Sequence, residues 1–183
     1  MITKHLYGPA SLRWLPALLA LLLMALAAGG AGVREALAFD RAALDAGQLW
    51  RLLSAHFVHL GAYHTALNVI ALGIFVLLCP QAVPLRFWLR RLLLLSLAIS
   101  AALYYFVPAL QHYVGFSGVM HGLFVLGLLP QARRGDRIAM LALLYLAAKL
   151  VYESVAGAPL SDARAIGGAV ITEAHRYGAL AAL

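Results

Sequence analysis

Charged side chains are scarce in this sequence: they make up 11% of 183 residues, whereas 64% are hydrophobic. An ordinary soluble domain carries about 25% charged residues. The shortage of charge and the abundance of apolar residues exclude a disordered chain and a typical water-soluble enzyme. The single cysteine, Cys79, excludes an internal disulfide.

Long apolar runs separated by short polar segments occupy most of the chain. A membrane span requires roughly 20 apolar residues to cross about 30 Å of hydrocarbon. The sequence therefore predicts an all-α polytopic membrane protein, a single domain over residues 1–183 with six transmembrane helices. The predicted spans cover about residues 14–29, 57–78, 87–107, 116–129, 138–155 and 167–183. Pro80, Pro108 and Pro130 are expected to end the second, third and fourth spans.

The first apolar run, from Trp14 to about Ala28, has two interpretations. It is short and ends in small residues, as a signal peptide does before its cleavage site. We favour a retained helix, because the distribution of basic residues then fits six spans with both chain ends in the cytoplasm. The basic clusters are Lys4 and Arg13; Arg86, Arg90 and Arg91; and Arg133, Arg134 and Arg137. They recur at every second loop, so the net charge of +7 indicates membrane topology and lipid contact, and no nucleic-acid partner is expected.

The fourth predicted span is short. Its 14 or so residues would measure about 21 Å, less than the roughly 30 Å of the hydrocarbon layer. Its N-terminus is therefore expected to lie below the outer surface of the membrane. Non-helical backbone at that depth is tolerated where it lines a protein cavity or water, which suits residues 111–115 just before the span.

Polar side chains inside membrane spans are costly, so each is a functional candidate. Three pairs are spaced by four residues and therefore share a helix face: His64 with Asn68, Ser117 with His121, and Lys149 with Glu153. The sixth predicted span adds Glu173, His175 and Arg176. These residues include a nucleophile, a base and donors for an oxyanion.

Ser117 and His175 are the best candidates for nucleophile and base. Ser117 lies in the predicted first turn of a helix, where free N–H groups and the helix dipole favour a developing oxyanion. His64 and Asn68 could donate to the same oxyanion. Small residues at four-residue spacing allow two helix backbones to approach closely, as a Ser–His hydrogen bond requires. These are Gly118 and Gly122 on the fourth span, and Gly178 and Ala182 on the sixth.

Simpler roles exist for the same residues. A serine in a membrane helix usually bonds its own backbone, and His59 could be an interfacial residue. The His64 and Asn68 pair could join helices or hold a metal. Only Glu153 and Glu173 are available as carboxylates within the spans, so no metal and no other cofactor is predicted.

Taken together, these motifs resemble the rhomboid family of intramembrane serine proteases. The resemblance covers residues 50–183 and implies a six-helix rhomboid-like bundle with a Ser117–His175 dyad. It implies an oxyanion site of His64, Asn68 and the backbone at Phe116. The matching segments are Trp50-Arg51; His59, His64 and Asn68; Gly115-Phe116-Ser117-Gly118; and His175 with Gly178, where Ala182 replaces the usual glycine. His121 stands where many rhomboids have a tyrosine that packs on the histidine, and Arg176 is unusual in that helix.

More narrowly, the chain is similar to rhombosortases, the bacterial branch paired with GlyGly-CTERM proteins. The resembling segments are residues 50–60, 118–122, 149–153 and 173–180. This resemblance implies membrane-anchored substrates whose C-terminal tail has a Gly-Gly motif, an apolar helix and a basic end. It also implies a multi-pass protein of the bacterial inner membrane whose active site opens to the periplasm.

The sequence leaves the role of the Lys149 and Glu153 pair open. The pair could neutralise two buried charges, or it could face the substrate or assist a nucleophile other than water. Glu173 is two residues from His175 and projects to nearly the opposite side of the helix, so a dyad without a third acid is expected. Hydrolysis and transfer to an amine acceptor both remain open. The other candidates are a general rhomboid protease, a non-catalytic rhomboid-like chaperone and a helical transporter.

Overall fold

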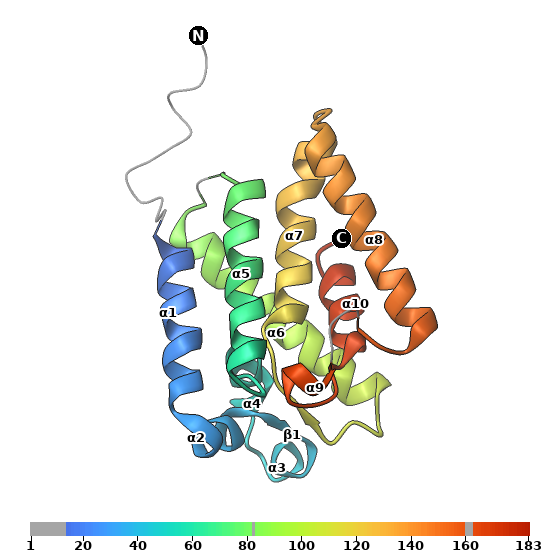
Figure 1. Ribbon diagram of the computed structural model, residues 1–183. Helices are drawn as coiled ribbons and strands as arrows, with labels where there is room; N and C mark the ends of the chain where they lie inside the picture. Colours follow the sequence, from blue (N-terminus) through green and yellow to red (C-terminus); the bar gives the residue numbers. More distant parts are fainter. Residues whose placement is uncertain (1–13, 82, 160–162) are drawn as a thin grey trace.

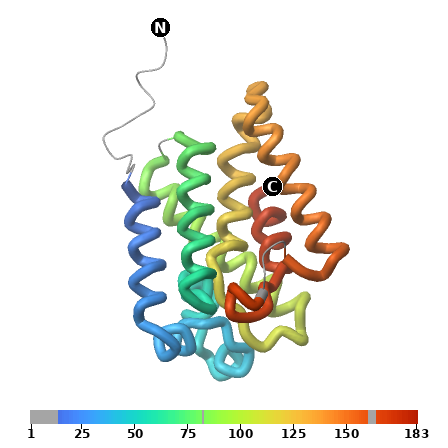
Figure 2. The backbone as a smooth tube through the Cα atoms, viewed as in Figure 1, coloured from blue at the N-terminus to red at the C-terminus, as the bar shows by residue number. Residues whose placement is uncertain are grey.

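The computed structural model describes residues 14–81, 83–159 and 163–183, so the predicted cluster at Lys4 and Arg13 lies outside the described residues. It is a bundle of helices packed around α7 (Figures 1 and 2). The principal helices are α1 (Leu15–Ala28), α5 (Ala62–Leu78), α6 (Leu85–Phe106), α7 (Ser117–Ala132), α8 (Arg137–Ala156) and α10 (Thr172–Leu180). Helix α7 contacts α5, α6, α8 and α10, which explains why it has residues buried on all of its faces.

Short elements form a cap at one end of the bundle. They are α2 (Gly30–Leu37), α3 (Arg41–Asp45), α4 (Arg51–Ser54), the 3-10 helix η1 (Ala55–Phe57), and the two-residue strands β1 (Phe39–Asp40) and β2 (His112–Tyr113), which pair antiparallel. Arg51 is buried in this cap and donates to the carbonyl oxygens of Glu35 and Ala38, each at 2.7 Å. The neighbouring Trp50 indole donates to the Ala36 carbonyl at 3.3 Å. Both residues of the predicted Trp-Arg pair therefore hold the cap in place.

By length and composition, two described helices, α6 and α8, could each cross a membrane. The number rises to four if each of two bent pairs counts as one span. These pairs are α1 with α2, bent by 112°, and residues 51–57 with α5, bent by 87°. These helices support a polytopic bundle. Judged by length and composition alone, two to four of the six predicted spans are found.

Helix α7 extends past the proline that was expected to end it. Pro130 lies inside the helix, which continues to Ala132, so the predicted end at residue 129 is wrong. Proline has no N–H, so one backbone bond of the helix is missing at this position. The side-chain amide of Gln131 donates to the carbonyls of Gly127 and Leu78, both at 3.0 Å. The last turn of α7 is thereby fastened to the end of α5.

Only 9 of the 17 residues in the last predicted span, 167–183, are helical. Helix α9 (Ala163–Ile166) stops at Gly167, whose φ of 94° belongs to the left-handed region that interrupts a helix. Helix α10 begins only at Thr172 and has 9 residues. At 1.5 Å per residue it is about 13 Å long, too short to cross a membrane alone. The chain ends beside α7 and α8, partway along their length (Figure 2).

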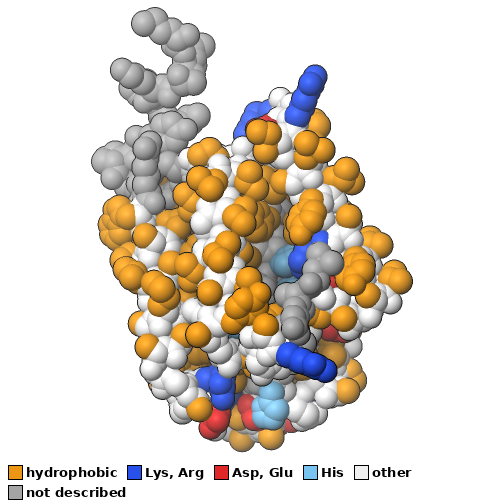
Figure 3. All heavy atoms as spheres, in the orientation of Figure 1, with side chains coloured by type: hydrophobic (Ala, Val, Ile, Leu, Met, Phe, Trp, Pro, Cys, Tyr) orange, Lys and Arg blue, Asp and Glu red, His pale blue; other side chains and the backbone are white. Residues whose placement is uncertain are grey.

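The basic clusters at residues 86–91 and 133–137 lie at the same end of the bundle. The first cluster is in the first turns of α6, and the second joins α7 to α8. The connections that carry them are both at the end opposite the cap (Figure 1). In Figure 3 most charged side chains lie toward the two ends, a few lie at a hollow between them, and hydrophobic side chains cover most of the remaining surface. This distribution suits a protein embedded in a bilayer.

Glycines bring α7 and α10 into backbone contact. A Cβ built on Gly118 would lie 2.8 Å from the carbonyl oxygen of Ala174, and one built on Gly122 would lie 2.7 Å from that of Gly178. A Cβ on Gly178 would overlap the carbonyl oxygen of Gly118. The faces of small residues predicted on these two helices therefore do meet. No residue larger than glycine fits at the contact.

Replacing Gly178 with alanine should destabilise the protein by about 3 kcal/mol, because the new methyl group would push two backbones apart. The change is measured as a lower midpoint of thermal unfolding in detergent micelles. Gly73→Ala is the matched control, since a Cβ at that helical glycine would meet nothing within 4 Å. Equal unfolding midpoints for the two variants would contradict the tight contact.

Arg51→Lys should lower stability by about 2 kcal/mol, because an ammonium cannot reproduce the forked hydrogen bonds of the guanidinium. Thermal unfolding again provides the measurement. Arg90→Lys, at an exposed position of α6, serves as the control. An unchanged midpoint for Arg51→Lys would show that the cap does not depend on these bonds.

Candidate active site

Ser117 and His175 lie within hydrogen-bond distance of each other. Ser117 is the first residue of α7, and His175 is the fourth residue of α10. The Oγ atom of Ser117 is 2.9 Å from Nε2 of His175. The glycine contact between α7 and α10 makes this distance possible, because it removes the side chains that would hold the two helices apart.

The second ring nitrogen of His175 meets a carboxylate. Nδ1 lies 2.8 Å from Oε2 of Glu153, which is on α8 and is buried. The expectation that no acid contacts the histidine is therefore wrong. Glu173 does point away from the ring, as predicted, and pairs with Arg176 at 3.4 Å. Sequence spacing could not identify Glu153, because it lies 22 residues from His175 on another helix.

Lys149 forms the predicted ion pair with Glu153 and also reaches a histidine. Its Nζ is 2.6 Å from Oε1 of Glu153 and 3.1 Å from Nε2 of His121. Nδ1 of His121 lies 2.7 Å from the carbonyl oxygen of Ser117, which can only accept a hydrogen bond. His121 therefore carries its proton on Nδ1, and its Nε2 accepts from the ammonium.

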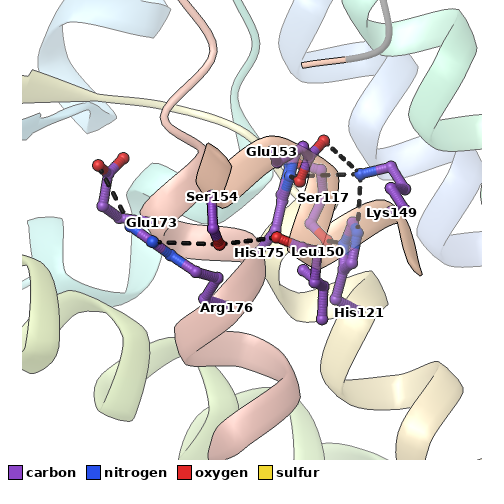
Figure 4. A network of polar contacts seen from close by, with 9 residues as sticks. All are labelled: Ser117, His121, Lys149, Leu150, Glu153, Ser154, Glu173, His175 and Arg176. Atoms are coloured by element: carbon purple, nitrogen blue, oxygen red, sulfur yellow. Dashed lines mark hydrogen bonds and ion pairs between the residues drawn. The ribbon is translucent and has the colours of Figure 1, made fainter. Parts of the chain in front are cut away.

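These contacts form a closed ring of five side chains, which we call the polar ring (Figure 4). It runs from Ser117 to His175, Glu153, Lys149 and His121, and returns to the backbone of Ser117. The rings of His121 and His175 are stacked, with centroids 4.2 Å apart. The position occupied by tyrosine in many rhomboids is thus filled by a histidine that packs on the candidate base.

The polar ring could be taken for a metal site. Donor atoms of His121, Glu153 and His175 all lie within 4.8 Å of one another. However, the Lys149 ammonium already contacts Glu153 and His121. A metal ion would have to displace this cation, so these residues do not fit a metal.

Beside the polar ring lies a cavity of about 300 Å³ between α5, α7 and α8. His64, Asn68, Ser117, His121, Lys149 and His175 line its polar part, and residues such as Leu78, Phe124, Leu128, Tyr145 and Leu146 line the rest. Figure 3 shows the hollow in the hydrophobic face, with histidine and basic side chains visible inside it. The structure therefore brings the candidate oxyanion donors to the same cavity as the candidate nucleophile.

The orientation of His64 suits a donor. Its Nδ1 accepts a long hydrogen bond, 3.4 Å, from the backbone N–H of Leu60, which leaves the proton of the neutral ring on Nε2. Nε2 faces Gly115, where a Cβ would come within 3.1 Å of it. The Asn68 amide donates to the His64 carbonyl at 2.9 Å and retains a second N–H.

Backbone N–H groups at the start of α7 add further donors. Among the described residues, the N–H of Phe116 has no hydrogen-bond partner. The first N–H groups of any helix also lack an acceptor within the helix. An anion formed beside Ser117 would therefore meet several free donors.

Three other predicted residues lie outside the cavity. His59 packs edge-on against the His64 ring, with centroids 4.9 Å apart, and is buried. Within the part of the chain that the structure describes, neither of its ring nitrogens has a hydrogen-bond partner. Trp50 and Arg51 belong to the cap. These three support the site or the fold without lining the cavity.

Sequence reasoning did not single out a second Ser–His pair. His56 Nε2 lies 2.9 Å from Ser100 Oγ and 3.0 Å from the Ser96 carbonyl oxygen, and the Ser100 distance also suits a dyad. However, His56 is fully buried, and the Ser100 hydroxyl donates to the Leu52 carbonyl at 2.6 Å. The pair joins α6 to the segment before α5 and does not line the cavity beside Ser117.

Comparison with known protein families supports the geometric interpretation. The model of the Rhomboid domain matches residues 46–183, a range that contains every residue of the polar ring and the candidate oxyanion donors. The comparison with curated proteins gives no match. The matched range covers well over half of the chain. The chain therefore belongs to the rhomboid family of intramembrane serine proteases.

Proposed function

We propose that this protein is a rhombosortase-like endopeptidase that cleaves the C-terminal sorting tails of exported proteins within the membrane. The tail would contain a Gly-Gly motif, an apolar helix and a basic end. The main support for the catalytic part of this proposal is the 2.9 Å distance between Ser117 Oγ and His175 Nε2 at the edge of the cavity. The proposed substrate class is supported by the resemblance of four sequence segments to rhombosortases.

In the proposed mechanism, Nε2 of His175 removes the proton from the Ser117 hydroxyl as Oγ attacks the scissile carbonyl. His64, Asn68 and the backbone N–H of Phe116 stabilise the oxyanion. When the intermediate collapses, the bond to the leaving amine breaks and His175 returns the proton to its nitrogen. The ester on Ser117 is then released by water or by an amine acceptor.

The cavity suits an apolar substrate helix with an unwound end. Apolar side chains line most of the cavity, and the polar side chains lie near Ser117. A peptide in a helix hides its carbonyl groups, so it must unwind before a nucleophile can reach them. Two consecutive glycines ease this unwinding, because glycine adopts irregular backbone conformations at little steric cost.

The distribution of charge supports an orientation in the bacterial inner membrane. The two described basic clusters lie at one end of the bundle and would face the cytoplasm. Ser117 begins α7 at the end of that helix away from the second cluster. The active site would then open toward the periplasm, with the start of α1 at the cytoplasmic end and lipid around the bundle.

Two alternatives remain distinct from this proposal. A general rhomboid protease would use the same residues on single-span proteins with a different tail. A non-catalytic rhomboid-like chaperone would not require a nucleophile and base held 2.9 Å apart, so the geometry favours an enzyme.

Ser117→Ala and His175→Ala should each abolish cleavage of a fusion protein that ends in a Gly-Gly, helix and arginine tail. Each substitution removes one partner of the proton transfer. Cleavage is measured with purified protein in liposomes. Ser100→Ala, in the second Ser–His pair, should retain activity and acts as the control. Full cleavage by purified Ser117→Ala would refute the assignment.

An acyl group on Ser117 should be transferable to an added nucleophile. With hydroxylamine present, mass spectrometry of the released substrate should show a hydroxamate on the new C-terminus. In membranes without hydroxylamine, a free carboxylate would identify water as the acceptor, and an added mass would identify an amine. A carboxylate alone, even at high hydroxylamine concentration, would argue against an acyl intermediate.

A further inference from the structure

We propose that Glu153 is a positioning residue for His175, so that this protein uses a Ser117–His175–Glu153 triad whose acid comes from α8. This inference rests on the proposed function, because it assumes that His175 acts as the base. It assigns to Glu153 a role beyond the ion pair with Lys149.

The two shortest hydrogen bonds of the His175 ring define the roles of its nitrogens, because the third contact, from Lys149 Nζ to Nδ1, is longer at 3.5 Å. Nδ1 is 2.8 Å from a Glu153 oxygen, and Nε2 is 2.9 Å from Ser117 Oγ. A carboxylate can only accept a hydrogen bond, so Nδ1 must carry the proton. Nε2 is then left with a free lone pair directed at the serine hydroxyl, as a general base requires.

Glu153 is held where it can act on the ring. Its side chain is fully buried, and its two oxygens are divided between Lys149 and His175. A buried carboxylate is stable only when it is paired and hydrogen-bonded. The Lys149 ammonium at 2.6 Å supplies the opposite charge. This pairing allows Glu153 to stay ionised beside the base.

His121 fixes the position of the lysine in turn. It joins the ammonium to the backbone of Ser117, so the polar ring ties the acid to the nucleophile as well as to the base. A purely structural ion pair would need only Lys149 and Glu153, which already lie one turn apart on α8. The additional bond from Glu153 to His175 connects α8 to α10 at the reacting atoms.

Glu153→Gln is the direct test. A glutamine amide can donate to Nδ1 and so shift the ring proton to Nε2, where it blocks proton removal from the serine. We expect kcat for the tail substrate to fall by about 10²- to 10⁴-fold. KM should change by less than about threefold, since Glu153 is not among the residues that line the cavity.

Two further variants separate positioning from charge balance. Lys149→Met combined with Glu153→Gln removes both charges, so it keeps the buried region neutral and should fold. Under the proposal this double variant stays as slow as Glu153→Gln. Glu173→Gln is the matched control, because Glu173 lies near His175 in sequence but pairs with Arg176, and it should retain wild-type kcat.

Labelling by a fluorophosphonate probe distinguishes the failure of this inference from that of the proposed function. We expect the wild type to be labelled at Ser117 and Glu153→Gln to be labelled at least about 10²-fold more slowly. Equal rates for these two proteins, or a wild-type rate in the neutral double variant, would overturn the triad and leave the dyad standing. A wild type that is neither labelled nor active would overturn both.

Discussion

The backbone contact between α7 and α10 is the constraint on which the site depends. Gly118 and Gly178 permit a separation that no side chain would allow. Ser117 and His175 precede these glycines by one and three residues, so the same contact sets the distance between nucleophile and base. In a membrane, where lipid removes the usual hydrophobic drive between helices, such close packing is itself a main source of helix association. The contact between α7 and α10 therefore contributes both to the stability of the fold and to the geometry of the reacting groups.

A second constraint is the cost of charge inside a membrane. Lys149 and Glu153 would each be unfavourable alone in an apolar surrounding, and together they are nearly neutral. Their placement one turn apart on α8 lets them pair within a single helix. The pair therefore places a carboxylate beside His175 while its own net charge stays close to zero.

The sequence was informative where function imposes a local pattern. The spacing of His64 with Asn68 and of Ser117 with His121 predicted shared faces, and the structure places all four beside one cavity. The small faces on α7 and α10 were likewise predictable, because close packing requires small residues at regular spacing.

The errors arose where distant segments decide the outcome. The acid partner of His175 was missed because its distance along the chain carries no information about its position in space. The end of α7 was misplaced because the rule for proline is local, whereas the Gln131 amide fastens the last turn of α7 to the Leu78 carbonyl at the end of α5. The last span was overestimated because the chain is not helical between the left-handed turn at Gly167 and the start of α10 at Thr172.

The exposed position of α8 has a physical consequence for how the protein responds to its surroundings. Most of this helix faces outward, and its described contacts with the bundle run through α7 and α10. The carboxylate that contacts His175 is on this outer helix, so the contact depends on α8 keeping its place against α7 and α10. Lipid packed against the outer face of α8 would therefore help to hold that carboxylate at the histidine.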